Sequence, residues 1–176
     1  MDFLKKIQIF FAIIVAFAIV ILILNWYNSY SFKNNPIPLE YQQAIDKKEQ
    51  EVLRYMKKNL GFKFQVPIIV TDEIPGKIYG VTSMNKEGKI MIYLNKKVMR
   101  ESMDYILDSV IAHEYAHAVL FKTGDYKRDA DGHSELWRQV CIELGGLNCQ
   151  KYVDSHDVIM RKLTTVFMHK NEQSPL

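Results

Sequence analysis

The sequence predicts an α+β domain in which a small sheet of three or more strands packs against a long helix, with one transmembrane helix ahead of the domain. Three observations support this prediction. The chain of 176 residues begins with an uninterrupted apolar segment. Short segments rich in β-branched and aromatic residues lie in the middle of the chain, which is typical of strands. Apolar residues at helical spacing precede and follow those segments.

Residues 1–27 are predicted to form a transmembrane anchor. Every residue from Ile9 to Leu24 is apolar, and no charged side chain occurs between Lys6 and Lys33. At 1.5 Å per residue this apolar run covers about 24 Å, and its uncharged flanks extend the helix to the thickness of a bilayer. We therefore expect residues 7–27 to lie in the lipid bilayer.

A cleaved signal peptide is the main alternative for this segment. The apolar region of a signal peptide is usually shorter and ends at a cleavage site of small residues. Here the apolar run is followed by NWYNSYSF, which contains no such site. A buried core helix would carry a polar stripe, and this segment has none. The uncleaved anchor is the preferred interpretation.

The basic residues beside the span predict its orientation. Lys5 and Lys6 precede the span, and Lys33 is the only basic residue in the dozen positions after it. Cytoplasmic flanks of transmembrane helices are enriched in lysine and arginine. We therefore expect a single-pass membrane protein with its N-terminus in the cytoplasm and its domain outside the cytoplasm.

The charge of the remaining chain is nearly balanced. Asp2, Lys5 and Lys6 lie within the first 24 residues, so 21 basic and 19 acidic side chains follow. Such a balance provides no general attraction to nucleic acid, and no nucleic-acid partner is expected.

Cys141 and Cys149 are the only cysteines of the chain. Outside the cytoplasm they could pair across the two glycines between them. Two free or buried thiols are an equally good interpretation of the sequence alone.

The domain is predicted to comprise residues 38–170, between a linker at 28–37 and a tail at 171–176. The linker is polar and contains Pro36, and Pro38 follows it directly. The first helix of the domain is expected at residues 39–60, where apolar residues recur at helical spacing and Gly61 follows the end.

Three strands are predicted next, within residues 63–71, 77–84 and 88–95. The turn signals DEIPG and NKEG separate them. The last two strands are expected to form a hairpin.

Three more helices are predicted in the second half of the chain. The first occupies residues 102–121 and ends near Gly124. A polar loop at 123–132 leads to a second helix at 133–146, which glycines close. A last helix is expected at 155–170.

The stretch VIAHEYAHAVL, residues 110–120, contains the candidate site. His113 and His117 are four positions apart, so on a helix their imidazoles lie on one face and can bind one metal ion. With Glu114 they match H-E-x-x-H, in which two histidines bind zinc and the glutamate is the general base. The uncharged flanks of the motif indicate a buried helix beneath a cleft.

This motif predicts a specific chemistry for Glu114. Zinc lowers the pKa of water to near 7, and the carboxylate can take a proton as that water attacks a carbonyl. The same carboxyl group then returns the proton to the leaving amine. A catalytic zinc site needs a third protein ligand and an open fourth position. His133 is the strongest candidate, since it follows a loop and opens the next helix, and Glu135 and Glu143 are the alternatives.

With these residues in place, the chain resembles the SprT-like zinc metallopeptidases. AHEYAHA, a loop and GHSELWRQVCIELGG are similar to the family's H-E-x-x-H-A motif, its later glycine-histidine pair and the short helix that ends in glycine. The resemblance covers residues 66–146 and implies a zincin-like fold with the sheet packed on the active-site helix. It implies that one Zn²⁺ ion binds to His113, His117 and His133, that Glu114 is the general base, and that Trp137 packs behind the third ligand.

The resemblance implies a zinc metalloendopeptidase. Many SprT-like proteins end in a cysteine-rich zinc ribbon, which a chain with two cysteines cannot build. The better-known members act inside the cell on proteins crosslinked to DNA, a role that the anchor and the balanced charge argue against. The expected substrate is a protein or peptide near the membrane. The alternative is a catalytically silent zincin-like domain that binds metal or a partner protein.

Four other residues have side chains that could take part in the site. Asp108 lies five positions before His113 and either orients a ligand histidine or faces solvent. Tyr126 is a candidate to stabilise an oxyanion, although a surface tyrosine is the commoner case. His156 and His169 are expected to be exposed rather than to bind zinc.

Overall fold

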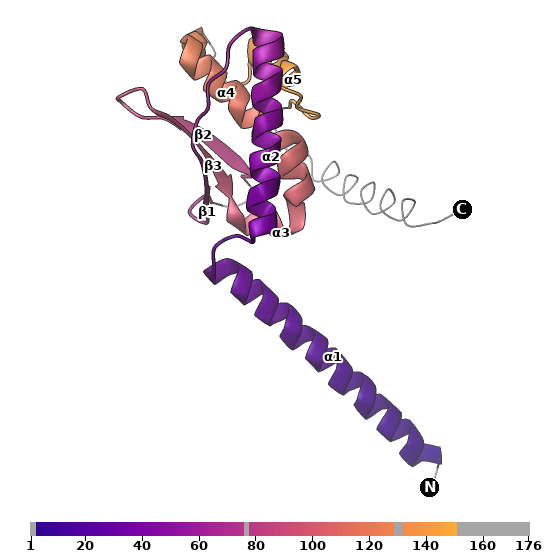
Figure 1. Cartoon of the computed structure of the whole chain (residues 1–176). Helices are drawn as coiled ribbons and strands as arrows, with labels where there is room; N and C mark the ends of the chain where they lie inside the picture. Colours follow the sequence, from indigo (N-terminus) through magenta and orange to yellow (C-terminus); the bar gives the residue numbers. More distant parts are fainter. Residues whose placement is uncertain (1–2, 76–77, 129–131, 151–176) are drawn as a thin grey trace, which may run out of the picture. The chain divides into compact units, whose positions relative to one another are not determined.

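The computed structural model describes residues 3–75, 78–128 and 132–150 (Figure 1). By its internal contacts the chain divides between Ile37 and Pro38 into two compact units. The first unit contains one helix, and the second has the predicted α+β composition. The predicted last helix at 155–170, the tail, and His156 and His169 lie outside the described residues.

Helix α1 (Phe3–Asn34) forms the first unit. It contains one candidate membrane span, Lys5–Asn34, and no part of its apolar window is buried inside the structure. The helix also continues through most of the predicted linker 28–37. It ends at Asn34 because the next residue precedes Pro36, and a residue before proline avoids the helical conformation.

Helix α2 (Leu39–Tyr55) opens the second unit. A π-helical turn, η1 (Met56–Leu60), extends it to Gly61, which has a φ of 79° and ends the helix in the left-handed conformation. The helix predicted at residues 39–60 is thus confirmed. Its buried side is apolar apart from one glutamate, and includes Ile45, Glu49, Val52, Leu53 and Met56.

The sheet has three strands in the order β1-β3-β2. Its strands are β1 (Ile68–Thr71), β2 (Gly80–Met84) and β3 (Ile90–Asn95). β3 pairs in parallel with β1 and antiparallel with β2, so the predicted hairpin is confirmed. All three strands begin later than predicted. Pro67 has no N–H for a ladder before β1, and a turn closed by the Asn85 N to Lys89 O hydrogen bond precedes β3.

The helix that carries the motif is preceded by a short helical segment that was not predicted. α3 (Lys96–Tyr105), the π-helical turn η2 (Ile106–Val110) and α4 (Ile111–Thr123) follow one another in sequence. Ser102, inside α3, has the non-helical angles φ −140° and ψ 29°, so the run is kinked at the residue where the motif helix was predicted to begin. The segment before the kink starts at Asn95, whose side chain accepts a hydrogen bond from Lys97 N as an N-cap. The end at Gly124 is confirmed by its φ of 82°.

Helix α4 lies in the centre of the second unit. It contacts β2 and β3 on one side, and α2 and α5 (Glu135–Glu143) on others (Figure 1). Between Ile111 and Leu120 every residue is buried except His113 and His117, which are half-buried. The motif helix is therefore a core helix with one accessible face.

Helix α5 starts two residues later than predicted and is closed by a disulfide. Ser134 is its N-cap and accepts a hydrogen bond from Trp137 N, so His133 lies just outside the helix. At the other end Cys141 and Cys149 form a disulfide, which resolves the alternatives that the sequence left open. A side chain at Gly146 would come within 2.7 Å of the Cys141 sulfur, which explains a glycine there.

A buried polar network joins α2, α4 and the segment that leads to β1. Tyr115 of α4 donates a hydrogen bond from its hydroxyl to Glu49 Oε1 of α2. Gln65 donates to the other oxygen of Glu49 at 2.9 Å, and Val66 N donates to the Tyr115 hydroxyl at 3.4 Å. Burial and the nearby Glu49 carboxylate raise the pKa of Tyr115, which keeps its hydroxyl a donor.

Replacing Tyr115 by phenylalanine should lower the free energy of unfolding by about 1–3 kcal/mol, because the buried Glu49 would lose a donor. Urea unfolding of a fragment that starts at Asn34 measures the change. Tyr93→Phe is the matched control, since that hydroxyl contacts only the Met91 sulfur at 3.6 Å. Equal losses in the two variants would contradict this role of the network.

Candidate metal centre

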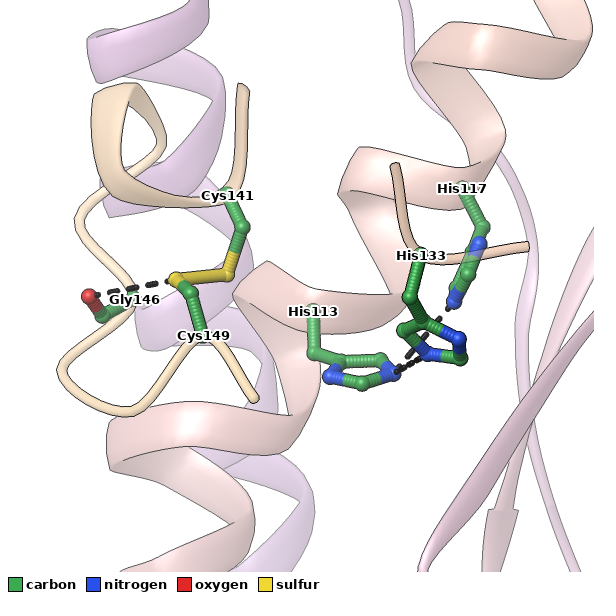
Figure 2. The surroundings of a disulfide bond; sticks show 6 residues. All are labelled: His113, His117, His133, Cys141, Gly146 and Cys149. Carbon is green, nitrogen blue, oxygen red and sulfur yellow. Dashed lines mark hydrogen bonds between the residues drawn. A yellow bond between two sulfur atoms is a disulfide. The ribbon is translucent and has the colours of Figure 1, made fainter. Parts of the chain in front are cut away.

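Three histidine side chains converge at one point beside α4 (Figure 2). His113 and His117 come from successive turns of α4, and His133 comes from the segment before α5. The Nε2 atom of His113 lies 3.3 Å from that of His117 and 3.2 Å from that of His133. The structure thus brings together the three histidines that the sequence singled out as metal ligands.

The spacing of these nitrogens fits a metal ion. In a tetrahedral site with metal–nitrogen distances of about 2.0–2.1 Å, two ligand nitrogens are about 3.3 Å apart. One ligand atom from each of the three residues lies within 4.8 Å of the other two. No carboxylate or cysteine joins this group within the described residues. The three side chains could therefore hold one ion and leave a position open.

The environment of His113 keeps its imidazole neutral. Burial, together with the charges of His117 and His133, lowers the pKa of His113 to about 3. A neutral imidazole presents a lone pair, which is the form that binds metals. At neutral pH His113 is therefore ready to act as a ligand.

Trp137 supports the three histidines from one side. Trp137 is 1% exposed and lies in the first turn of α5. Its ring centroid lies 4.6, 5.3 and 4.5 Å from those of His113, His117 and His133. Trp137 thus packs on all three rings, and not only behind the third, as the resemblance implied. This contact fixes the histidine rings before any ion binds.

Glu114 is buried next to this group, on the side of α4 that faces the sheet. Its side chain accepts a hydrogen bond from the Thr82 hydroxyl of β2, with 2.7 Å between the oxygens. Burial raises the pKa of Glu114 to about 7, and the bond from Thr82 opposes part of that rise. With a pKa near 7, the carboxyl group can both take and release a proton at neutral pH.

The alternatives for the third ligand do not join the histidines. Glu135 and Glu143 are exposed on α5, and neither belongs to the converging group. Asp108, the candidate to orient a histidine, is half-buried, and its backbone carbonyl accepts a hydrogen bond from Leu147 N. Thr82 was missed by sequence reasoning, since it lies 32 positions before Glu114 and no motif connects the two.

Tyr126 lines a small hollow beside the histidines. The hollow has a volume of about 180 Å³ and is bounded by His117, Leu120, Phe121, Tyr126 and Gly132. The ring of Tyr126 packs edge-on against Phe121, with 5.3 Å between the centroids. The tyrosine therefore belongs to an apolar wall next to the centre.

Replacing His133 by alanine should abolish tight zinc binding, because two histidines alone leave the site without its third ligand. The zinc content of the full-length protein after dialysis measures the effect. We expect one ion per chain in the unmodified protein and in the matched control Glu135→Gln. Zinc retained by His133→Ala, or lost from Glu135→Gln, would contradict this ligand set.

Replacing Glu114 by glutamine should change how stability depends on pH in the metal-free domain. The pKa of Glu114 is raised from 4.5 to about 7, so its favourable contribution is complete below about 4.5 and is lost as pH rises through about 7. Relative to the unmodified domain, Glu114→Gln should therefore gain roughly 1–3 kcal/mol between pH 5 and pH 8. Urea unfolding at both values measures the gain, and a difference that does not vary with pH would refute it.

Comparison with known proteins places this site in a family. Residues 42–156, more than half of the chain, match the SprT-like family. Searches of curated proteins and of solved structures give no significant match. The matched region contains His113, Glu114, His117 and His133. The chain therefore belongs to the SprT-like family.

Proposed function

We propose that this protein is a membrane-anchored zinc metalloendopeptidase that hydrolyses peptide bonds. The observation that carries the proposal is the convergence of His113, His117 and His133, with Glu114 buried directly beside the first of them. Membership of the SprT-like family supports it.

Zinc is the metal that we propose for the centre. Imidazoles suit zinc, and three protein ligands with an open fourth position are typical of catalytic zinc sites. The three histidines are half-buried, so solvent and substrate can reach them. When bound, zinc polarises the scissile carbonyl and lowers the pKa of water.

Glu114 is the proposed general base. Its carboxylate takes the proton of the water that attacks the peptide carbonyl, and it later gives this proton to the leaving amine. A pKa near 7 suits both transfers, because the group is then partly ionised at neutral pH. No carboxylate of the described residues belongs to the group of three histidines, which supports Glu114 as a base rather than as a ligand.

The free edge of β2 is the proposed docking edge for the substrate backbone. Among the described strands, β2 pairs only with β3 and is thus an edge strand. Its Thr82 contacts Glu114, so the strand lies next to the centre. An extended peptide that adds to this edge would bring its backbone close to the three histidines. The proposed substrates are therefore unfolded or extended protein segments.

The proposed location of the domain is outside the cytoplasm, tethered to the membrane by α1. α1 is long and apolar enough to span a bilayer. The disulfide between Cys141 and Cys149 supports an oxidising compartment, in agreement with the basic residues ahead of the span. Because α1 ends at Asn34 and α2 begins at Leu39, the domain would stay close to the membrane. The tether would therefore restrict the substrates to proteins near the membrane surface.

The second candidate is a silent zincin-like domain that binds metal without turnover. A structural zinc site is closed by a fourth protein ligand. The converging group contains three ligands within the described residues, which favours the enzyme. Asp125, Asp129 and Asp131 are the carboxylates near the motif in the sequence that could supply a fourth ligand. Asp129 and Asp131 lie outside the described residues, and Asp125 belongs to the 3₁₀ turn η3 (Asp125–Arg128).

Proteolysis of an unfolded substrate such as β-casein by the zinc-loaded, full-length protein tests the proposal. Glu114→Gln should lower kcat/KM at least 100-fold, roughly the contribution of a general base, while the zinc content stays at one per chain. Glu135→Gln, a substitution on the exposed face of α5, is the matched control and should keep full activity. Zinc binding with no turnover by the unmodified protein would instead favour the silent domain.

A further inference from the structure

We propose that Thr82 is a positioning residue for Glu114, and that Gly80 provides the space in which the carboxylate is held. The inference rests on the proposed function, since it assigns a role in the same reaction. It concerns β2, an element that lies outside every motif of the sequence.

Thr82 contacts Glu114 at two points. Its hydroxyl oxygen lies 2.7 Å from the Oε2 atom of Glu114 and 2.8 Å from the backbone carbonyl oxygen of the same residue. One hydroxyl therefore connects the strand to both the helix backbone and the carboxylate. Within the described residues, the hydrogen bonds to this carboxylate come from Thr82, through its hydroxyl and its backbone, so the orientation of the carboxylate depends on Thr82.

Gly80 confines the other carboxylate oxygen. A Cβ atom at this position would lie 2.9 Å from Glu114 Oε1 and 3.0 Å from Glu114 Cγ. The same atom would lie 2.9 Å from a methyl group of Val110. A side chain here would force Glu114 to move, which is the physical reason for a glycine in this strand.

Gly80 and Thr82 act from the same face of β2. Side chains alternate along a strand, so residues two positions apart point to one face. Thr82 holds one oxygen of Glu114, and the bare backbone at Gly80 lies against the other. The carboxylate is thus clamped between two positions of one edge strand, which fixes it relative to the histidines of α4.

A threonine is well suited to this position. Its β-branched side chain has few rotamers, so little entropy is lost when the hydroxyl is held in place. A hydroxyl can both donate and accept. It can donate to the Glu114 carboxylate, and it can accept from the carboxylic acid while its own hydrogen turns to the Glu114 carbonyl oxygen. Thr82 can therefore hold the general base both before and after the proton is taken.

The test compares Thr82→Val with Thr82→Ser in the zinc-loaded, full-length protein. Valine keeps the shape and removes the hydroxyl, and serine keeps the hydroxyl. We expect Thr82→Val to lower kcat by roughly 10- to 100-fold with unchanged KM and zinc content, because the base loses its hydroxyl partner and keeps only the backbone contact to residue 82. Thr82→Ser should restore kcat to within about threefold of the unmodified protein.

Thr123→Val is the matched control, since it removes a hydroxyl from α4 that bonds only to backbone carbonyl groups of its own helix. It should leave kcat unchanged. A kcat for Thr82→Val equal to that of the unmodified protein would overturn the inference and leave the proposed peptidase intact. Equal losses in Thr82→Val and Thr82→Ser would overturn it as well.

Infrared spectroscopy of the metal-free protein tests the contact between Thr82 and Glu114 without any need for turnover. The carboxyl band of Glu114 is identified by its loss in Glu114→Gln. We expect this band to shift in Thr82→Val and to stay in place in Thr82→Ser. An unshifted band in Thr82→Val would overturn the inference, even if the protein proves to have no peptidase activity.

Discussion

The burial of α4 is the constraint on which the rest of the structure depends. The sheet covers one side of this helix, and α2 and α5 cover others, so that between Ile111 and Leu120 only His113 and His117 keep partial contact with solvent. Two ligands on one rigid, buried helix have little freedom to move. The third, His133, is held by the cap of α5 and by Trp137, which packs on all three imidazoles. The geometry of the centre is therefore set by the core of the domain.

A helix buried on so many sides must also satisfy its polar groups. The motif places two polar residues, Glu114 and Tyr115, on buried sides of α4. Each finds its partner on a different neighbouring element: Thr82 of β2 bonds to Glu114, and Glu49 of α2 accepts from Tyr115. The two contacts tie α4 to the sheet on one side and to α2 on the other. The same bonds that satisfy buried groups thus also fix the position of the helix, since an unpaired group would be costly.

The sequence was sufficient for the parts of the site that are local. The four-residue spacing of His113 and His117 decides their common face, and the hairpin and the end of α4 at Gly124 follow from turn and cap residues. The sequence was insufficient where the position of an element or side chain depends on a distant contact or on a single capping residue. The segment of α3 before the kink at Ser102 starts at an Asn95 cap that the apolar pattern does not reveal, and the continuation of α1 to Asn34 depends on proline rather than on apolar pattern. Thr82 becomes visible only when β2 is packed on α4.

The most direct test of the central claim is the position of the metal. A crystal structure of the zinc-loaded domain, with the ion located by its anomalous scattering, would give that position. We expect one ion at about 2.0–2.1 Å from the Nε2 atoms of His113, His117 and His133, with no fourth protein ligand. An ion closed by a fourth side chain, or bound away from these histidines, would contradict it.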